Sequence, residues 1–324
     1  MNSFCASQRD DELHLRSTVG DLWAITSYFN PMRYQRRRAN YRIFRERLNL
    51  PLLAVELAYG ADFELEKNDA EVLVQLRGRD VMWQKERLLN VALGALPRSC
   101  RKVAWMDCDI IFECDDWSER VSLLLDQFAL LQLFSHAYRM PRAWLPGELP
   151  PPGTELRRSL PFIVASGMPT VTCLETPARQ CGSAYGLAWA ADRKLVEVHG
   201  FYDSCIVGSG DRAMACAAYG CCDVAIRRLL MNEKEKQHYL AWAKPYHEAV
   251  RGRVGFLENN LFHLWHGETA NLGKRARHEG FQRFHFDPIQ DIAIDSNGCW
   301  HWSTDKPEMH EYVRKYLASR KEDG

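Results

Sequence analysis

The sequence predicts an α/β protein with a mostly parallel central sheet and helices on both faces. Between residues 21 and 112, apolar β-rich runs alternate with helical patterns, and Gly or Pro residues separate them. Parallel strands need such crossovers and are covered on both faces, so they are apolar along their whole length. The predicted strands are 21–29, 50–60, 70–78 and 102–112, and the predicted helices are 34–48, 81–96 and 115–134.

Composition excludes several classes of protein. The chain has 324 residues, of which 46% are hydrophobic, and its 42 Lys and Arg balance its 42 Asp and Glu, which argues against nucleic acid as the main partner. No apolar segment approaches the roughly 20 residues that cross a bilayer, and the N-terminus does not resemble a secretory signal. The 11 cysteines form no CxxC pair, as expected of buried reduced thiols. We therefore expect a cytoplasmic protein.

The second part of the chain is mixed in pattern. Six prolines lie between Pro141 and Pro161, which excludes regular strands there and suggests a long loop, either a substrate-facing flap or a passive surface segment. The expected organisation is an N-terminal extension (1–20), an α/β half (21–137), a second half with the Pro-rich loop (138–270) and a C-terminal tail packed on the same domain (271–324).

Two aspartates interrupt the fourth apolar run, in "WMDCDIIF". Asp107 and Asp109 point to the same side of an extended chain, about 6.5 to 7 Å apart, so they can converge on one cation. Two carboxylates could not both stay ionised in a dry core without a nearby positive charge. Hard oxygen ligands suit Mg²⁺ or Mn²⁺, particularly with a diphosphate.

Three interpretations of this triplet are open. The aspartates could simply end a strand and cap the next helix. They could belong to a phosphatase of the haloacid-dehalogenase type, although Ile111 stands where that family has Thr or Val, and three strands precede the motif instead of none. They could also hold a divalent ion against the donor of a nucleotide-sugar glycosyltransferase, whose DxD follows the fourth strand. The position along the chain favours the third.

A longer series of motifs resembles bacterial GT-A glycosyltransferases related to family 2, and distantly the β-1,4-galactosyltransferases. It runs from "FNP" through "RRRANYRIF", "LPLLAVELAYG", "VLVQLRG" and "MWQKERLLNVAL" to "KVAWMDCDIIF", with weaker matches in "YGLAWAADR", "HGFYDSCIVGSGD", "HLWHG" and "RHEGFQRFHFDP". The resemblance covers residues 22 to 117 most strongly. It implies a GT-A, Rossmann-like fold and a metal-dependent transferase, in which residues 21–137 are the nucleotide-sugar-binding half and residues 138–270 the acceptor-binding and catalytic half.

The resemblance also implies a metal site. The galactosyltransferases use the second Asp of the DxD and a Met and a His three residues apart. Here Asp109, His263 and His266 occupy these positions, with His263 in place of Met, so that His263 either binds metal or only packs. Asp107 would then reach the ribose or a metal-bound water.

The acceptor side is implied by "VGSGD". In the relatives a Gly-rich acidic motif floors the acceptor pocket and supplies the general base, which makes Asp211 the expected base and places Gly208 and Gly210 at the acceptor. Asp211 could also cap a helix over 211–220. Trp189 matches an aromatic residue that stacks on the acceptor, and a core position is the alternative.

The residues expected to bind the nucleotide-sugar donor lie near the ends of the predicted strands. Arg33 suits phosphate, Glu56 could accept from uracil N3–H, and Lys85 could balance the diphosphate or lie on a helix surface. The expected donor-binding residues are Thr26, Tyr28, Asn30, Arg33, Glu56, Arg77, Lys85 and Asp107.

The predicted function is transfer of a sugar from a UDP-sugar to an acceptor hydroxyl, with Mn²⁺ or Mg²⁺ as cofactor. Inversion at the anomeric centre is expected from the resemblance alone. The expected partners are the donor and a glycan or other hydroxyl acceptor, with no nucleic acid and no membrane span, while contact with a membrane surface stays open. The alternatives are the phosphatase, a catalytically inactive GT-A domain and a sugar-phosphate nucleotidyltransferase, which normally has a Gly-rich N-terminal loop that "YFNPMRYQRRR" lacks.

Overall fold

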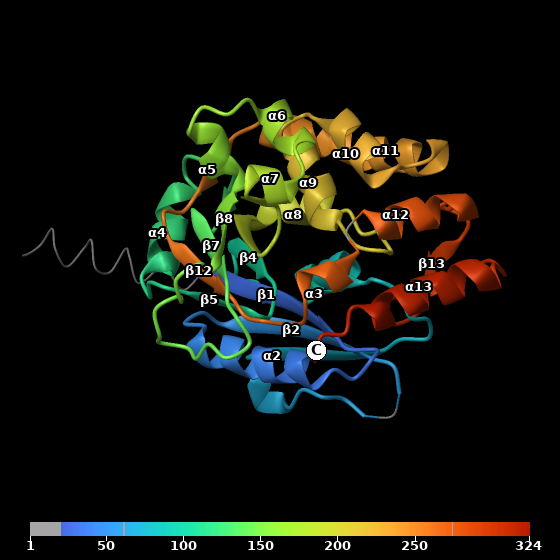
Figure 1. Cartoon of the computed structure of the whole chain (residues 1–324), viewed down its shortest axis with the longest axis horizontal. Coiled ribbons are helices and arrows are strands. Elements are labelled where there is room, and N and C mark those ends of the chain that lie inside the picture. The colour runs from blue at the N-terminus through green and yellow to red at the C-terminus, as the bar shows by residue number, and fades with distance from the viewer. Residues whose placement is uncertain (1–20, 61, 274) are drawn as a thin grey trace, which may run out of the picture.

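The computed structural model describes residues 21–60, 62–273 and 275–324 (Figure 1). The predicted N-terminal extension, residues 1–20, lies outside the described residues. None of the described helices combines the length and the apolar character that crossing a bilayer demands. The cysteines within the described ranges are all free thiols.

The central sheet has seven strands in the order β11-β6-β10-β4-β1-β2-β3. Neighbouring strands are parallel except at β10, which runs antiparallel to both β4 and β6. The predicted mostly parallel sheet is therefore confirmed. The strands are β1 (Leu22–Phe29), β2 (Leu52–Ala58), β3 (Val72–Arg77), β4 (Lys102–Met106), β6 (Leu130–Gln132), β10 (Ala188–Asp192) and β11 (Val254–Phe256).

Helices cover both faces of this sheet, as its apolar strands require. Successive residues of β1 point to opposite faces, so Ile25 packs in one core cluster and Ala24 in the other. The first cluster includes α3 (Lys85–Ala95), α8 (Arg193–His199), α9 (Gly210–Ala218), α10 (Cys222–Leu229) and α11 (Glu233–Val250). The second includes α2 (Gln35–Arg47) and α4 (Trp117–Leu124).

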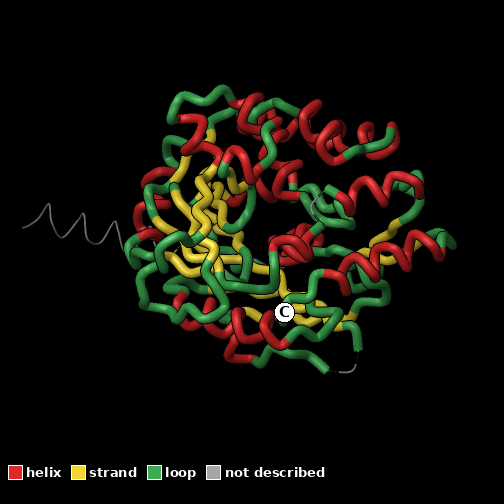
Figure 2. The backbone as a smooth tube through the Cα atoms, in the orientation of Figure 1, coloured by secondary structure: helices red, strands yellow, loops and turns green. Residues whose placement is uncertain are grey.

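A second, mixed sheet lies beside the first. Its order is β5-β12-β7-β8-β9, and Figure 2 shows strands gathered on the side of the molecule away from α12 and α13. Its strands are β5 (Ile110–Phe112), β7 (His136–Arg139), β8 (Glu155–Ser159), β9 (Ser183–Ala184) and β12 (Asn260–His263). The segment 140–154 connects β7 to β8 and contains no strand, but β8 itself lies between Pro152 and Pro161 and pairs with β7, so the prediction that the prolines exclude regular strands from Pro141 to Pro161 is wrong for its last part.

The remaining elements connect these strands and form the C-terminal part of the chain. They are η1 (Lys67–Asp69), α5 (Leu160–Ala165), α6 (Thr170–Glu175), α7 (Ala178–Cys181), η2 (Thr269–Leu272), α12 (Ala276–Phe281), η3 (Gln282–Phe284), β13 (Ile292–Ile294), β14 (Trp300–Trp302) and α13 (Pro307–Ser319). Figure 1 shows the C-terminus beside α2, where the Asp323 carboxylate accepts from the Arg36 backbone N–H at 2.8 Å.

Two predicted elements are wrong in extent. The predicted strand 102–112 is two strands in different sheets, because β4 pairs with β1 whereas β5 pairs with β12. The predicted helix 115–134 ends at Leu124, and the apolar residues after it form β6, which is buried between β10 and β11. The central sheet thus contains strands from both predicted halves, and the division at residue 137 stays a prediction.

Candidate functional site

The Asp107–Asp109 turn lies where the chain leaves the central sheet for the second sheet. It directly follows β4, and β5 directly follows it and pairs antiparallel with β12. The register sets His263 opposite the first residue of β5, and the Leu264 N–H donates to the Asp109 carbonyl at 2.8 Å. This pairing explains how the triplet meets a histidine far away in the sequence.

Asp109, His263 and His266 form a candidate metal centre. His263 Nε2 lies 3.5 Å from Asp109 Oδ1, His266 Nε2 lies 3.7 Å from Asp109 Oδ2, and the two Nε2 atoms are 3.2 Å apart. The side chains are 23%, 11% and 9% exposed, in the order Asp109, His263 and His266, so the group is shielded from bulk water. Within the described ranges no other group of three His, Cys, Asp or Glu side chains brings its ligand atoms together in this way.

The geometry of this centre fits a divalent ion. Asp109 Oδ1 and His266 Nδ1 are buried and have no hydrogen-bond partner among the described residues. Bonds of about 2.0 to 2.2 Å to one ion place neighbouring ligand atoms roughly 3 to 3.5 Å apart, close to the distances found here. Three protein ligands leave positions open for a substrate. Two imidazoles weigh against Mg²⁺, which prefers oxygen ligands.

The protonation states also suit metal binding. Burial raises the pKa of Asp109, but His263, His266 and Arg37 outweigh burial and hold the pKa below its usual range. Burial lowers the pKa of His266 to about 4. At neutral pH the centre therefore offers an ionised carboxylate and a neutral imidazole, the forms that bind a cation.

A second charged cluster lies beside the metal centre and is internally paired. Lys85 Nζ lies 2.6 Å from Asp107 Oδ1 and 3.0 Å from both carboxylate oxygens of Asp211. Burial lowers the pKa of Lys85, but Asp107, Asp211 and Glu86 outweigh burial and raise it well above its usual value. Lys85 is not on an exposed helix surface. It bridges the first aspartate of the triplet and the predicted base.

Two glycines leave room for the side chains of this cluster. Its members are Lys85, Asp107, Asp211 and Glu86, and it is called the Lys85 cluster below. A Cβ added to Gly186 would lie 2.4 Å from Asp211 Oδ2, and one added to Gly210 would lie 2.2 Å from Glu86 Oε1. Burial and then Asp211 raise the pKa of Glu86 to about 8, so Glu86 carries a proton at neutral pH. The cluster thus combines one ammonium, two carboxylates and one carboxylic acid.

The predicted acceptor loop is held in an unusual backbone conformation. Gly208 has φ +86° and Ser209 has φ +83°, a region that non-glycine residues rarely adopt. Arg277 Nη2 donates to Ser209 Oγ at 2.5 Å, and His278 Nε2 lies 3.1 Å from the same oxygen. Ser209 is the N-cap residue of α9, and the Asp211 carboxylate pairs with Lys85 instead of capping the helix.

Four predicted donor residues line one small pocket near the carboxyl ends of β1 and β2. Tyr28, Asn30, Arg33 and Glu56 all contribute to it. Asn30 Nδ2 donates to Glu64 Oε2 at 2.9 Å, and the Tyr28 hydroxyl donates to the same carboxylate. Arg33 is exposed, and its ion pair with the exposed Asp62 is long, at 3.9 Å. The sequence did not single out Glu64, which lies in the segment after β2.

Two residues predicted to contact ligands belong to the scaffold. The Thr26 hydroxyl is fully buried and donates to the Met106 carbonyl at 2.8 Å, which joins β1 to β4. Trp189 is 4% exposed and its Nε1 donates to the Tyr185 carbonyl at 2.9 Å. In this arrangement neither side chain presents a free group or face to a nucleotide or sugar.

The same holds for Glu56 and Arg77. Glu56 is 1% exposed, and its carboxylate accepts from Gln75 Nε2 at 2.9 Å and from two backbone N–H groups after β2. These donors occupy the oxygens that were expected to meet a base. Arg77 donates to the Gly60 carbonyl and lies over the ring of Phe63 at 4.5 Å, so it holds the same segment from the sheet edge.

Residues near the C-terminus pack beside His266 of the candidate metal centre. Arg37 Nη2 lies 2.6 Å from Glu322 Oε1, and Arg320 Nε lies 2.7 Å from the same oxygen. The backbone there packs so closely on Gly267, directly after His266, that a Cβ would lie 2.6 Å from the Lys321 carbonyl. No local sequence motif predicted the pair of Arg37 and Glu322, because nearly the whole chain lies between these two residues.

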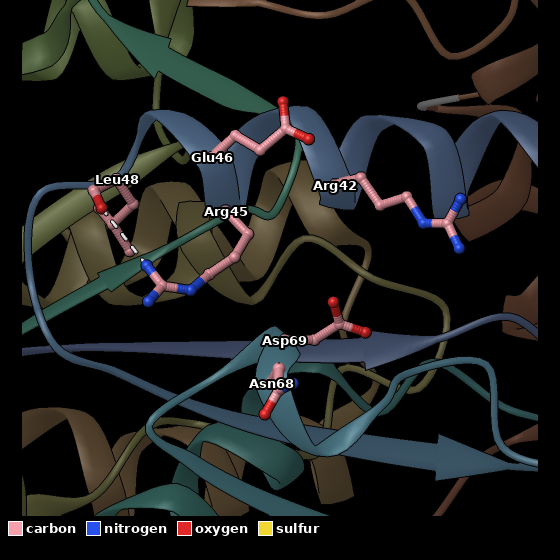
Figure 3. A pocket seen from close by; sticks show the side chains of 6 residues that line it. All are labelled: Arg42, Arg45, Glu46, Leu48, Asn68 and Asp69. Carbon is pink, nitrogen blue, oxygen red and sulfur yellow. Dashed lines mark hydrogen bonds between the residues drawn. The ribbon is translucent and has the colours of Figure 1, made fainter.

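A larger surface hollow lies between α2 and η1 and is separate from this site (Figure 3). Its volume is about 670 Å³, and none of the metal-centre or Lys85-cluster residues lines it. Arg45 donates to the Leu48 carbonyl there at 3.3 Å and pairs with Glu71 at 2.5 Å. The residues lining the hollow are Arg42, Arg45, Glu46, Leu48, Asn68 and Asp69.

No protein-family model and no curated protein sequence matches the chain. Several solved structures are similar to it. The mannosyltransferase PcManGT from Pyrobaculum calidifontis, in complex with GDP-Man and Mn²⁺, is 14% identical with a TM-score of 0.42, over 92% of this chain and 73% of that chain. TarS from S. aureus, in complex with UDP-GlcNAc, is 10% identical with a TM-score of 0.42, over 92% and 72%.

A third similar structure is 4-diphosphocytidyl-2C-methyl-D-erythritol synthase from Anaerococcus prevotii. It is 11% identical with a TM-score of 0.32, over 74% of this chain and 88% of that chain. All three similarities are distant, so the function is argued below from the side chains of the site. The chain's solved structural neighbours thus include glycosyltransferases in complex with a nucleotide sugar, one of them also with Mn²⁺.

Proposed function

We propose that this protein is a metal-dependent glycosyltransferase that moves a sugar from a UDP-sugar to an acceptor hydroxyl, with inversion. The observation that carries the proposal is the division of the Asp107–Asp109 triplet. Asp109 brings its ligand atoms together with those of two histidines, and Asp107 joins Asp211 through Lys85. A donor-activating centre and a candidate base therefore lie side by side.

Each cluster has a distinct proposed role. Asp109, His263 and His266 would hold Mn²⁺, which when bound supplies positive charge to the leaving diphosphate. Lys85 holds the Asp211 carboxylate through both oxygens, which orients it toward a hydroxyl. Asp211 accepts the proton of that hydroxyl as its oxygen attacks the anomeric carbon.

The donor nucleotide is assigned to the pocket lined by Tyr28, Asn30 and Arg33. Arg33 carries a guanidinium that suits phosphate oxygens, and it is not committed to a close ion pair. Asn30 and Tyr28 both donate to Glu64, so this carboxylate is held in place as an acceptor for a base N–H. Glu64 replaces Glu56 in the expected contact with uracil.

The test is release of UDP from a panel of UDP-sugars, with and without Mn²⁺. We expect release from at least one donor to require the ion, and we expect Asp109→Asn to abolish it. Asp115→Asn is the matched control, because Asp115 is an exposed aspartate that has no part in either cluster. GDP-sugars are included, since one structural neighbour holds GDP-Man.

Two results would exclude the proposal. One is the absence of metal-dependent nucleotide release from every donor while Mn²⁺ still binds, which would favour an inactive sugar-nucleotide-binding domain. The other is hydrolysis of p-nitrophenyl phosphate that depends on Asp107, which would favour the phosphatase. Analysis of the anomeric product separately decides whether the reaction inverts, and retention would exclude the role of Asp211 as the base.

A further inference from the structure

Four arginines near the proposed acceptor side have no acidic partner. Within residues 21–60, 62–273 and 275–324, no carboxylate forms an ion pair with any of them. Nearby carboxylates are already used: Glu175 pairs with Arg227 at 2.5 Å, Glu279 with Arg275 at 2.7 Å, and Asp211 with Lys85. The four are Arg158 in β8, Arg212 in α9, Arg228 in α10 and Arg277 in α12, and they are called the arginine cluster below. Figure 1 shows α9 and α10 as neighbours on this side.

Arg212 is the best-positioned member of the arginine cluster. It directly follows Asp211, its guanidinium carbon lies 4.0 Å from the ring centroid of Tyr185, and Nη1 donates to the Leu174 carbonyl at 3.0 Å. Gly186 lies directly against the Asp211 carboxylate, and its neighbour Tyr185 lies under the Arg212 guanidinium. The guanidinium is therefore held over the ring of Tyr185, the neighbour of the glycine that contacts the proposed base, and no hydrogen bond to a described residue uses its other N–H donors.

Arg228 is also uncommitted. No hydrogen bond or ion pair of its side chain is found in the part of the chain that the structure describes. Burial and the positive charges of Arg212 and Arg275 lower its pKa. The remaining members differ, since Arg158 makes one long hydrogen bond to the Cys181 carbonyl and Arg277 is held by Ser209 and Tyr316.

The members of the arginine cluster lie within reach of one another's charge, since Arg212 acts on Arg228, and Arg212 and Arg277 both act on His278. Burial and the charges of Arg277 and Arg212 lower the pKa of His278 to about 3, so His278 is neutral and adds no charge. Like charges at close range repel, and such an arrangement is stabilised when an anion enters it. The guanidinium fork binds phosphate and carboxylate through paired hydrogen bonds.

We propose that Arg212 and Arg228 bind an anionic group, a phosphate or a carboxylate, on the acceptor. The inference rests on the proposed function, because it names the class of acceptor used at the same site. The hydroxyl that Asp211 deprotonates then belongs to a molecule that carries its negative charge close to that hydroxyl. A neutral glycan lacks the group that these arginines bind.

The test is binding of inorganic phosphate and, separately, of acetate to the full chain in EDTA, measured by calorimetry or NMR titration. EDTA removes metal ions to which phosphate could bind. We expect Arg212→Gln and Arg228→Gln each to weaken phosphate binding by roughly tenfold or more, the loss of a charge-assisted hydrogen bond. Arg98→Gln, at an exposed arginine after α3 that has no ion pair within the described ranges, is the matched control and leaves binding unchanged.

The comparison of ligands and variants makes the outcome decisive. Arg212→Lys keeps the charge but not the fork, so an effect smaller than that of Arg212→Gln supports direct contact. Preference for phosphate or for acetate identifies which anion the acceptor carries. Absence of phosphate and acetate binding to the wild-type protein, or an equal loss in Arg98→Gln, overturns the proposal.

Failure of this proposal and failure of the proposed function are distinguishable. Anion binding in EDTA needs neither donor nor metal ion, whereas UDP release by the wild-type protein needs both. Circular dichroism of Arg212→Gln shows whether it folds, since Arg212 also packs on Tyr185. If that variant does not fold, Arg228→Gln alone decides the question, because its side chain makes no hydrogen bond to a described residue.

Discussion

Asp109 and Asp107 differ by two positions in the sequence and have opposite electrostatic environments. Asp109 faces two histidines, and its Oδ1 atom is buried with no hydrogen-bond partner among the described residues. Asp107 faces Lys85, whose ammonium lies 2.6 Å away. The carboxylate of Asp109 thus meets imidazole nitrogens, whereas that of Asp107 meets an ammonium.

This difference shows that the two aspartates of the triplet have different partners in the fold. The Lys85 cluster holds its carboxylates without any ligand, so it is a preorganised part of the fold. The metal centre has converging lone pairs that one external ion can satisfy. We therefore expect changes in the Lys85 cluster to affect stability and changes in the metal centre to affect metal affinity.

Removal of the internal cation has the largest expected effect. In Lys85→Met, the carboxylates of Asp107 and Asp211, whose side chains are each 28% exposed, lose their buried ammonium partner, and the cost is at most the roughly 3 to 5 kcal/mol of breaking a fully buried pair. Urea unfolding at neutral pH measures the loss. The deficit shrinks at low pH, where the carboxylates become protonated. A Lys85→Met variant as stable as wild type would mean that the cluster is not held by charge pairing.

Removal of a metal ligand has the next largest effect. We expect Asp109→Asn and His266→Gln each to weaken Mn²⁺ binding by roughly 100-fold, at least as much as loss of an outer-shell partner. Titration calorimetry measures this affinity, with His301→Gln as the matched control. Asp107→Asn should weaken binding by less than about tenfold, because Lys85 already holds that carboxylate. Equal losses in Asp107→Asn and Asp109→Asn would contradict the division between the two aspartates.

A methyl group at Gly186 probes the shape of the Lys85 cluster. The Cβ of Gly186→Ala would lie 2.4 Å from Asp211 Oδ2, so the carboxylate must move and its bonds to Lys85 weaken. We expect a loss of about 1 to 3 kcal/mol in the free energy of unfolding, with unchanged Mn²⁺ affinity. Gly94→Ala is the control, since a Cβ there meets nothing within 4 Å, and a helical Ala stabilises by up to about 1 kcal/mol. Loss of metal affinity in Gly186→Ala would show that the two regions are coupled.

The change of stability with pH tests the protonation state of Glu86. Glu86 has a pKa of about 8 in the folded protein and 4.5 as its ordinary value. Between these values the folded state binds more protons than the unfolded state, so the free energy of unfolding falls as pH rises. Glu86→Gln should flatten this slope by up to about 1.4 kcal/mol per pH unit in urea unfolding. Parallel curves for the variant and wild type would mean that Glu86 is ionised in the fold.

Part of the site was predictable from sequence. Asp109 and His266 were expected to converge, and the pairing of β5 with β12 brings them together. Asp107 and Lys85 were expected on the donor side and do lie beside that centre. These residues interrupt apolar runs or begin helices, so their chemistry stands out against the local pattern.

Other residues could not be assigned from the sequence. Thr26, Glu56 and Trp189 looked functional because they are polar or aromatic residues near strand ends, but each is buried with its polar group bonded within the scaffold. Glu64 lies in a loop and was not predicted to be functional, yet its carboxylate accepts hydrogen bonds from both Tyr28 and Asn30. Residue type and position do not reveal which polar groups find partners inside the fold.

The sequence by itself determined the α/β class and the place of the aspartate triplet at the end of the fourth strand, because apolar periodicity and turn residues act locally. Only the tertiary structure decided that the chain changes sheets at this triplet, and that one ammonium joins Asp107 to Asp211. The physical reason is that ion pairs and metal ligands depend on distances through space. Those distances follow from strand register and packing, which the spacing of residues along the chain does not encode.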